Sequence, residues 1–296
     1  MWANNKIRMV ITGQCNINCF YCHNEGVSKQ SSFMSSTLIR RIGNTIAVSG
    51  TSPKISIVGG EPMTHPQVFE CFEIWSETAS EVSLTTNGLL LDESNIRALA
   101  ERGCSKIRLG IDSIESRRSR PSHGLKNESP ITRTVEAIRS HGVRLELNTV
   151  LTTFNAKELP YLIEYCLDRR ISAKFFELVT PPSGVSHRGN GIGRAYGPSA
   201  EEFQHCVESI ASVDRKWFDA GGTNDVYDID GVEIRYCRYL HPAAMCWRSG
   251  TRVSPLGQVS SCMETEGFGD EKSWSTYTIV SELVERSMSL GCNSVV

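Results

Sequence analysis

Short apolar runs alternate with longer amphipathic segments over the first 180 residues of the chain. Between the runs, apolar residues recur with a helical period, as in Val68–Trp75 and Ile131–Ile138. Alternating strands and helices predict a parallel sheet, and six such units predict an α/β fold, a partial TIM-like (βα)6 barrel. Catalytic groups are then expected at the carboxyl ends of the strands. The predicted strands are Ile7–Thr12, Lys54–Val58, Val82–Thr86, Lys106–Ile111, Leu145–Leu151 and Lys174–Val179.

The pattern changes after residue 180. Residues 181–198 are rich in glycine and proline, which is typical of a linker or lid. Beyond them we predict a helix near Pro198–Val213, a strand pair in VYDIDGVEIRY and a last helix near Thr276–Ser289. The chain is therefore expected to have a barrel core at 1–180, a linker or lid at 181–198 and a smaller region at 199–296.

Composition excludes several classes of protein. A net charge of −2 argues against a general nucleic-acid surface. No apolar run reaches the length of a membrane span, and the N-terminal residues do not form a signal peptide. The eleven cysteines are an odd number in a chain without an export signal, which favours the reducing cytoplasm over a disulfide framework.

Three cysteines follow the first predicted strand. Cys15, Cys19 and Cys22 have the spacing C-x3-C-x2-C in the run CNINCFYC. This spacing suits three thiolates on three irons of a 4Fe–4S cluster, whose fourth iron is left open for a small molecule. A zinc site is the alternative, but its fourth ligand would be His23, directly beside Cys22, and adjacent residues seldom bind one tetrahedral ion.

Two further motifs follow the next strands. Gly59, Gly60, Glu61 and Pro62 form a GGEP turn, and the third strand ends in TTNG with Thr86 and Asn87. Glycines let the backbone approach a ligand closely, and Glu61 is a possible acceptor for an ammonium group.

The order and sequence of these motifs resemble the radical S-adenosylmethionine (SAM) enzymes. The resemblance covers about residues 6–180 and implies that SAM binds the open iron through its methionine amino and carboxylate groups. One electron would then cleave SAM to methionine and a 5′-deoxyadenosyl radical, which takes hydrogen from a substrate. By the same resemblance, Tyr21 or Phe20 contacts the adenine, and Ser113 and Asn148 contact the ribose.

A second group of cysteines lies near the end of the chain. Cys246 and Cys262 flank Gly257 in the pattern C-x10-G-x4-C. This resembles the hairpin of the twitch extension, which carries an auxiliary 4Fe–4S cluster in some radical SAM enzymes. Cys237 or Cys292, or both, would complete the ligand set. The alternative is a hairpin with two buried thiols.

Among radical SAM enzymes, the chain is most similar to the GTP 3′,8-cyclases of molybdenum-cofactor synthesis. The resemblance implies that the substrate contacts are Arg8, Lys54, Arg248 and Arg252. Guanidinium groups at such positions suit phosphate oxygens.

The chain also departs from the cyclases. Ser56 and Glu146 stand where the cyclases have arginine and lysine, Lys174 stands where they have arginine, and the chain ends in CNSVV where they end in Gly-Gly. Lost positive charge weakens a triphosphate site, so we expect a nucleotide, nucleoside or sugar of a specialised biosynthetic pathway.

Three other functions stay open at this point: a peptide-modifying radical SAM enzyme, a GTP 3′,8-cyclase, and a non-enzymatic metal-binding protein. The cysteine motif begins at residue 15, which leaves little room for a leader-binding domain and argues against the first. The intact GGEP and TTNG motifs argue against the last. A radical SAM enzyme would also need an external electron donor such as a flavodoxin or ferredoxin.

Overall fold

The computed structural model describes residues 6–19, 21–22, 25, 27, 32–113, 130–178, 197–219, 224–238 and 251–260. Its strands form one sheet in the order β11-β10-β1-β2-β3-β4-β5-β6-β9-β8-β7. The strands are β1 (Lys6–Thr12), β2 (Lys54–Gly59), β3 (Glu81–Thr86), β4 (Cys104–Gly110), β5 (Arg144–Val150), β6 (Ser172–Phe176), β7 (Arg215–Asp219), β8 (Asn224–Ile229), β9 (Val232–Cys237), β10 (Thr251–Val253) and β11 (Val259–Ser260). The helices are α1 (Ser36–Ser49), α2 (Val68–Ser76), α3 (Glu93–Glu101), α4 (Pro130–Ser140), α5 (Leu159–Asp168) and α6 (Ala200–Ile210), with short 3-10 turns η2 (Pro62–Thr64) and η3 (Ala156–Glu158).

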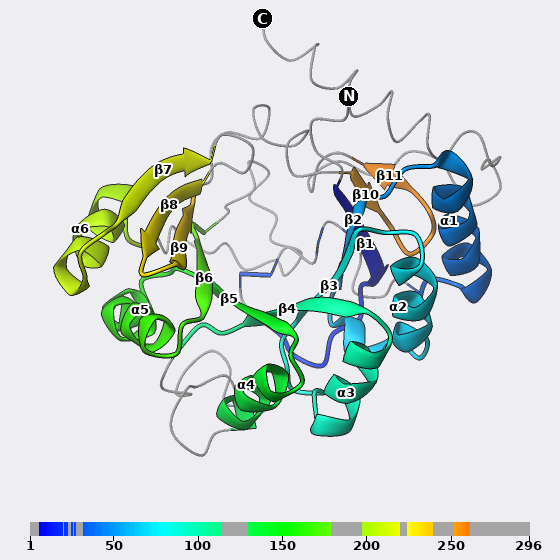
Figure 1. The fold of residues 1–296 in the computed structure, drawn as a ribbon, viewed down its shortest axis with the longest axis horizontal. Coiled ribbons are helices and arrows are strands. Elements are labelled where there is room, and N and C mark those ends of the chain that lie inside the picture. The colour runs from blue at the N-terminus through cyan, green and yellow to red at the C-terminus, as the bar shows by residue number, and fades with distance from the viewer. Residues whose placement is uncertain are drawn as a thin grey trace, which may run out of the picture.

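Strands β1 to β6 run parallel to one another, each beside the next in the chain. The sheet curves into an open horseshoe, and the helices cover its outer side (Figure 1). The predicted partial (βα)6 barrel is therefore confirmed. The sixth strand begins earlier than predicted and ends at Phe176; from Glu177 the backbone hydrogen-bonds to Cys237 at 3.0 Å instead of continuing the β5 ladder.

Apolar side chains on alternate strand positions pack against the outer helices. On β1 these are Ile7, Met9 and Ile11, all buried. The indole of Trp75, which has no exposed surface, donates to the carbonyl of Ile39 at 3.1 Å and joins α2 to α1. Because the apolar residues face the helices, the intervening strand positions face the inside of the horseshoe.

The sheet continues beyond the sixth strand. The predicted strand pair is the antiparallel hairpin β8–β9, which turns through left-handed backbone at Asp230 and Gly231. Strand β9 then pairs in parallel with β6. Helix α6 begins after a capping box between Ser199 and Glu202 and covers this end of the sheet.

A second hairpin extends the opposite edge. Strands β10 and β11 are antiparallel around a turn with Gly257 at φ 81°, as the sequence predicted. Strand β10 pairs in parallel with β1, so the C-terminal segment lies beside the first strand of the barrel. The predicted last helix, the linker up to residue 196, and the residues Cys246, Arg248, Cys262 and Cys292 lie outside the described residues. Within the described part, no helix has both the length and the apolar character that a membrane crossing requires.

His65 joins the GGEP turn to the segment before α1. Its Nδ1 accepts from the backbone N–H of Gln67 at 3.0 Å, so Nε2 carries the proton and donates to the Met34 carbonyl at 2.9 Å. Burial lowers the pKa of His65, which keeps the imidazole neutral.

The unfolded chain, in which His65 has its ordinary pKa of about 6.5, takes up the proton at a higher pH than the folded protein does. We therefore expect the free energy of unfolding to fall as the pH drops below about 6.5 towards the lower pKa that His65 has in the folded state. In thermal melts from pH 7.5 to 5.5, His65→Gln should show a lower Tm at pH 7.5 and a smaller loss on acidification than the wild type. The exposed His205→Gln serves as control. An unchanged pH slope in His65→Gln would exclude this role.

Candidate functional site

The loop after β1 carries the three N-terminal cysteines to the carboxyl edge of the sheet. Cys19 is buried, whereas Cys15 and Cys22 are partly exposed. The backbone N–H of Cys22 donates to the Cys19 carbonyl at 3.3 Å in a tight turn. Over the described residues, no three Cys, His, Asp or Glu side chains lie close enough together to hold a metal ion. The donor set still fits an iron–sulfur cluster, since three thiols share one short loop and two of them are accessible.

The GGEP turn packs directly against this loop. Gly60 donates its backbone N–H to Thr12 at 2.9 Å, and Glu61 donates to Gln14 at 2.7 Å. A Cβ atom on Gly59 would lie 2.2 Å from the Thr12 carbonyl oxygen, and one on Gly60 would lie 2.2 Å from that of Gln14. The close approach for which these glycines are needed is therefore to the backbone that leads into Cys15.

Glu61 joins the GGEP turn to the TTNG strand end. Its side chain has no exposed surface. The carboxylate accepts from the Thr86 hydroxyl at 2.7 Å, from the Asn87 backbone N–H at 2.7 Å and from the Met63 backbone N–H at 3.0 Å. Three protein donors thus share the carboxylate, and the contact with an ammonium group stays a prediction.

Asn87 completes the connection to the cysteines. Its side-chain amide donates to the Asn16 side chain at 2.7 Å and lies 3.9 Å from the Cys15 sulfur. The predicted residues Cys15, Gly60, Glu61, Thr86 and Asn87 are therefore joined by hydrogen bonds at one edge of the sheet.

The predicted adenine and ribose contacts lie at neighbouring strand ends. The Tyr21 hydroxyl donates to the buried Asp112 carboxylate after β4, and Ser113 donates to Glu158 at 2.7 Å. On β5, the side-chain oxygen of Asn148 is buried and has no hydrogen-bond partner among the described residues. Their contacts with SAM stay predictions. Phe20 and His23 lie outside the described residues.

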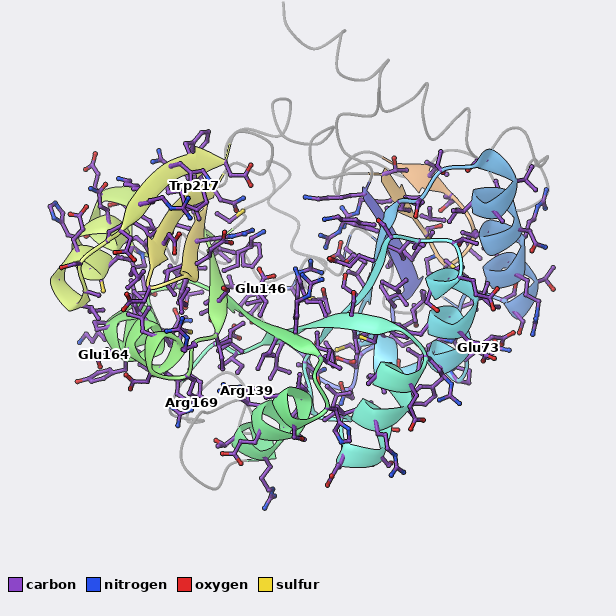
Figure 2. All side chains as sticks on the ribbon, viewed as in Figure 1. Glu73, Arg139, Glu146, Glu164, Arg169 and Trp217 are labelled. Atoms are coloured by element: carbon purple, nitrogen blue, oxygen red, sulfur yellow. The ribbon has the colours of Figure 1, made fainter. Side chains whose placement is uncertain are left out.

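Charged side chains line the inside of the horseshoe farther from the cysteine edge. Arg108 on β4 donates to the Ser83 hydroxyl at 2.8 Å and to Ser56 at 3.4 Å. Its Nε lies 3.4 Å from the Glu146 carboxylate, and the Lys106 ammonium lies 3.7 Å from it. Figure 2 places the Glu146 side chain inside the curve of the sheet, whereas Glu73 and Glu164 project from the outer helices.

These cations keep Glu146 ionised. Burial opposes its ionisation, but Arg108, Lys174 and Lys106 together hold its pKa below the ordinary value. Burial lowers the pKa of Lys174, while the carboxylate of Glu146 acts in the opposite direction. Strand register places Lys174 beside Asn148 on one side and Arg235 on the other. Arg235 in turn pairs with Glu233. Among the described residues of this wall, the cations Lys106, Arg108, Lys174 and Arg235 outnumber the carboxylates Glu81, Glu146 and Glu233.

Two of the predicted substrate arginines come together. Arg8 and Arg252 are register partners on β1 and β10, and both pair with the Glu25 carboxylate. The predicted substrate lysine, Lys54, does not join this pair. It is the exposed first residue of β2. The register partner of Arg8 on that strand is Ser56, which lies two positions farther from the amino edge of the sheet than Lys54 does. Arg248 is outside the described residues, so its role stays a prediction.

Cys237 ends β9 and is partly buried. It lies two residues after Arg235, the register partner of Lys174, so its side chain leaves β9 on the same face as Arg235, near the inner wall. The other three predicted auxiliary ligands lie outside the described residues, and the second cluster stays a prediction.

The sequence did not single out Glu25, Arg108 or Glu158. Glu25 lies three residues after Cys22 and belongs to none of the motifs that the sequence contains. Arg108 was detectable in principle, because it is a charged residue within an otherwise apolar predicted strand, where period-2 alternation turns it inward.

Comparison with known proteins gives the family. The model of the Radical SAM superfamily matches residues 9–166. A probable GTP 3′,8-cyclase of Methanocaldococcus jannaschii is 27% identical over 262 residues, covering 87% of this chain and 84% of that protein. One of Methanopyrus kandleri is 30% identical over 240 residues, covering 78% and 76%.

Solved structures agree on the fold. Streptococcus suis SuiB bound to its precursor peptide SuiA superposes with a TM-score of 0.67 at 12% identity, covering 94% of this chain and 65% of SuiB. The chain thus spans about two thirds of SuiB. The enzyme anSMEcpe with bound AdoMet gives a TM-score of 0.61 at 16% identity, covering 94% and 80%. With its motifs joined at the carboxyl edge of a partial barrel and the family model matched over more than half its length, this chain belongs to the radical SAM superfamily of enzymes.

Proposed function

We propose that this radical SAM enzyme binds SAM beside Cys15, Cys19 and Cys22 and takes hydrogen from a small substrate, a nucleotide, nucleoside or sugar, in the cytoplasm. The observation that carries the proposal is the hydrogen-bonded junction of the cysteine loop, the GGEP turn and the TTNG strand end through Glu61. The likeness to proteins named probable GTP 3′,8-cyclase supports a nucleotide-like substrate.

The three cysteines would hold a 4Fe–4S cluster, which when bound supplies the electron that cleaves SAM to methionine and a 5′-deoxyadenosyl radical. The chain's own part is positioning. Gly60 and Glu61 fix the backbone before Cys15, and Asn87 orients the loop beside the Cys15 sulfur. Asn148 offers an unused acceptor to a hydroxyl or amino group of SAM or substrate. A second cluster near Cys237 and an external flavodoxin- or ferredoxin-like donor complete the proposal.

The inner wall favours a substrate of modest negative charge. Arg108 and Lys174 attract an anionic group, but the ionised Glu146 stands between them and, with the Glu233 carboxylate that pairs with Arg235, repels a highly charged one. Its carboxylate also accepts hydrogen bonds from substrate hydroxyl or amino groups. This charge pattern favours a nucleoside, a monophosphate or a sugar over a triphosphate.

GTP cyclisation and peptide modification are the competing functions. The relatives named probable GTP 3′,8-cyclase favour the first. The peptide-bound SuiB structure shares the fold alone with this chain, so it adds little to the second. We expect nucleosides or nucleoside monophosphates to accelerate anaerobic SAM cleavage more than GTP or peptides do. Faster cleavage with GTP would favour the cyclase, and faster cleavage with peptides would favour the peptide-modifying enzyme.

The charge preference can be tested at Glu146. Replacing Glu146 by Gln leaves its neighbouring cations without their carboxylate, so we expect the preference to shift towards the triphosphate by about tenfold, measured as the ratio of KM values for GMP and GTP in SAM cleavage. Glu81→Gln is the matched control, because Glu81 also pairs with Lys106 and is similarly buried but begins β3 at the amino edge. An unchanged ratio in Glu146→Gln would show that this wall does not set the charge preference.

A further inference from the structure

Two arginines face the inside of the barrel from neighbouring strands. Arg8 on β1 and Arg252 on β10 are register partners in a parallel pair, so their side chains leave the sheet on the same face. The Arg252 side chain is only 4% exposed. Two cations side by side at such a site repel each other unless an anion lies between them.

The anion in this structure is a carboxylate of the protein itself. Glu25 lies three residues after Cys22, and its Oε1 accepts from the Arg8 guanidinium at 2.6 Å while Oε2 pairs with Arg252. The backbone of Glu25 is left-handed at φ 55°, a conformation that non-glycine residues rarely adopt. One carboxylate thus serves two guanidinium groups.

We propose that Glu25 is an intramolecular competitor for the anionic group of the substrate, and that a phosphate-type anion displaces it from Arg8 and Arg252. This inference rests on the proposed function, since it concerns how substrate reaches the same site. Guanidinium forks bind phosphate oxygens in the same two-point manner as carboxylate oxygens. A doubly charged phosphate brings two negative charges to the two arginines, whereas Glu25 brings one.

The surroundings of Arg8 fit an exchangeable anion site. Burial lowers its pKa, yet 33% of its side-chain surface is accessible, so the side chain is partly desolvated but can still be reached. Its Nε is buried and has no hydrogen-bond partner among the described residues. A larger anion that takes the place of Glu25 can therefore also use a donor that Glu25 does not engage.

Displacement of Glu25 would reach the cysteine loop. Only two residues separate Glu25 from Cys22, so release of its carboxylate removes an anchor at the end of that loop. The same exchange frees a residue from a strained backbone conformation. Substrate binding would thereby be coupled to the segment that carries the cysteines.

Pyrophosphate binding to the full-length, anaerobically reconstituted protein tests the proposal by isothermal titration calorimetry. Glu25→Gln should bind pyrophosphate at least about tenfold more tightly than the wild type, because the competing charge is gone. Arg8→Gln and Arg252→Gln should each weaken binding by a similar factor. Glu70→Gln is the matched control, because Glu70 pairs with Arg40 on the outer helices.

Equal or weaker binding by Glu25→Gln overturns the proposal, as does tight binding that survives both arginine substitutions.

Hydrogen exchange gives a second readout that needs no variant. Pyrophosphate should increase deuterium uptake in the wild-type peptide spanning residues 13–27 by about twofold, and unchanged or reduced uptake counts against release of the Glu25 carboxylate. Formation of 5′-deoxyadenosine is measured in the same preparations. Its absence from the wild type would refute the proposed function, whereas its presence together with unchanged pyrophosphate affinity in Glu25→Gln would refute the role of Glu25 alone.

Discussion

Replacing Cys15, Cys19 and Cys22 together by serine should abolish reductive SAM cleavage and remove one cluster. Serine is a harder and far less acidic ligand than cysteine, so the loop would no longer hold iron. Loss of groups that merely orient a metal ligand costs about 10–100-fold in activity, and loss of the ligands themselves should exceed that. Iron per reconstituted chain should fall from about eight to about four if the second cluster is present, and from about four to none if it is not.

Core cysteines provide the control for this experiment. Cys166 has almost no exposed surface, and burial raises the pKa of its thiol to about 12, so it stays a neutral core group. Cys166→Ala should leave both iron content and SAM cleavage unchanged and cost only packing energy. Full iron content in the triple serine variant would contradict the assignment of the N-terminal loop.

The second large effect is expected from Gly60→Ala. The added Cβ would lie 2.2 Å from the Gln14 carbonyl oxygen and 2.6 Å from its carbonyl carbon, both rigid backbone atoms. The GGEP turn would have to move away from the cysteine loop, breaking the hydrogen bonds from Gly60 to Thr12 and from Glu61 to Gln14. We expect a loss of about 3 kcal/mol in the free energy of unfolding and at least about a tenfold loss in SAM affinity.

Gly142→Ala separates these effects from backbone strain. Gly142 has φ 71°, but beyond its two chain neighbours no atom of the described residues lies within 4 Å of the position that an alanine methyl group would take. The alanine therefore costs about 1–2 kcal/mol of strain and touches no site residue. Thermal melts and equilibrium binding of SAM to reconstituted protein give the two readouts. If Gly60→Ala loses stability but binds SAM as the wild type does, the contact between turn and loop serves the fold alone.

The barrel was predictable because its signals are local. The apolar run of each strand, the helical period of Val68–Trp75 and the glycine at the hairpin turn each reflect a few neighbouring residues, and the structure confirms all three. The junction at Glu61 was predicted only in part. The order of the motifs indicated that the GGEP turn and the TTNG strand end meet. It did not indicate that the Glu61 carboxylate accepts hydrogen bonds from Thr86 and Asn87, because those contacts depend on how closely the two strand ends approach each other.

The inner wall was the least predictable part. Glu146 was expected to weaken an anion site, and its sequence position alone gives no sign that Arg108 reaches it from the neighbouring strand. The pairing of Arg8 with Arg252 depends on strand β10 joining β1 across more than 240 residues of chain. Such contacts are set by sheet register, which a single sequence without repeats does not reveal.

The most direct test is the yield of 5′-deoxyadenosine from SAM and dithionite with anaerobically reconstituted, full-length protein. We expect 5′-deoxyadenosine and methionine to accumulate in equal amounts with wild-type protein and neither to form with the triple serine variant. Intact SAM after incubation with wild-type protein that carries about four or more irons per chain would contradict this expectation.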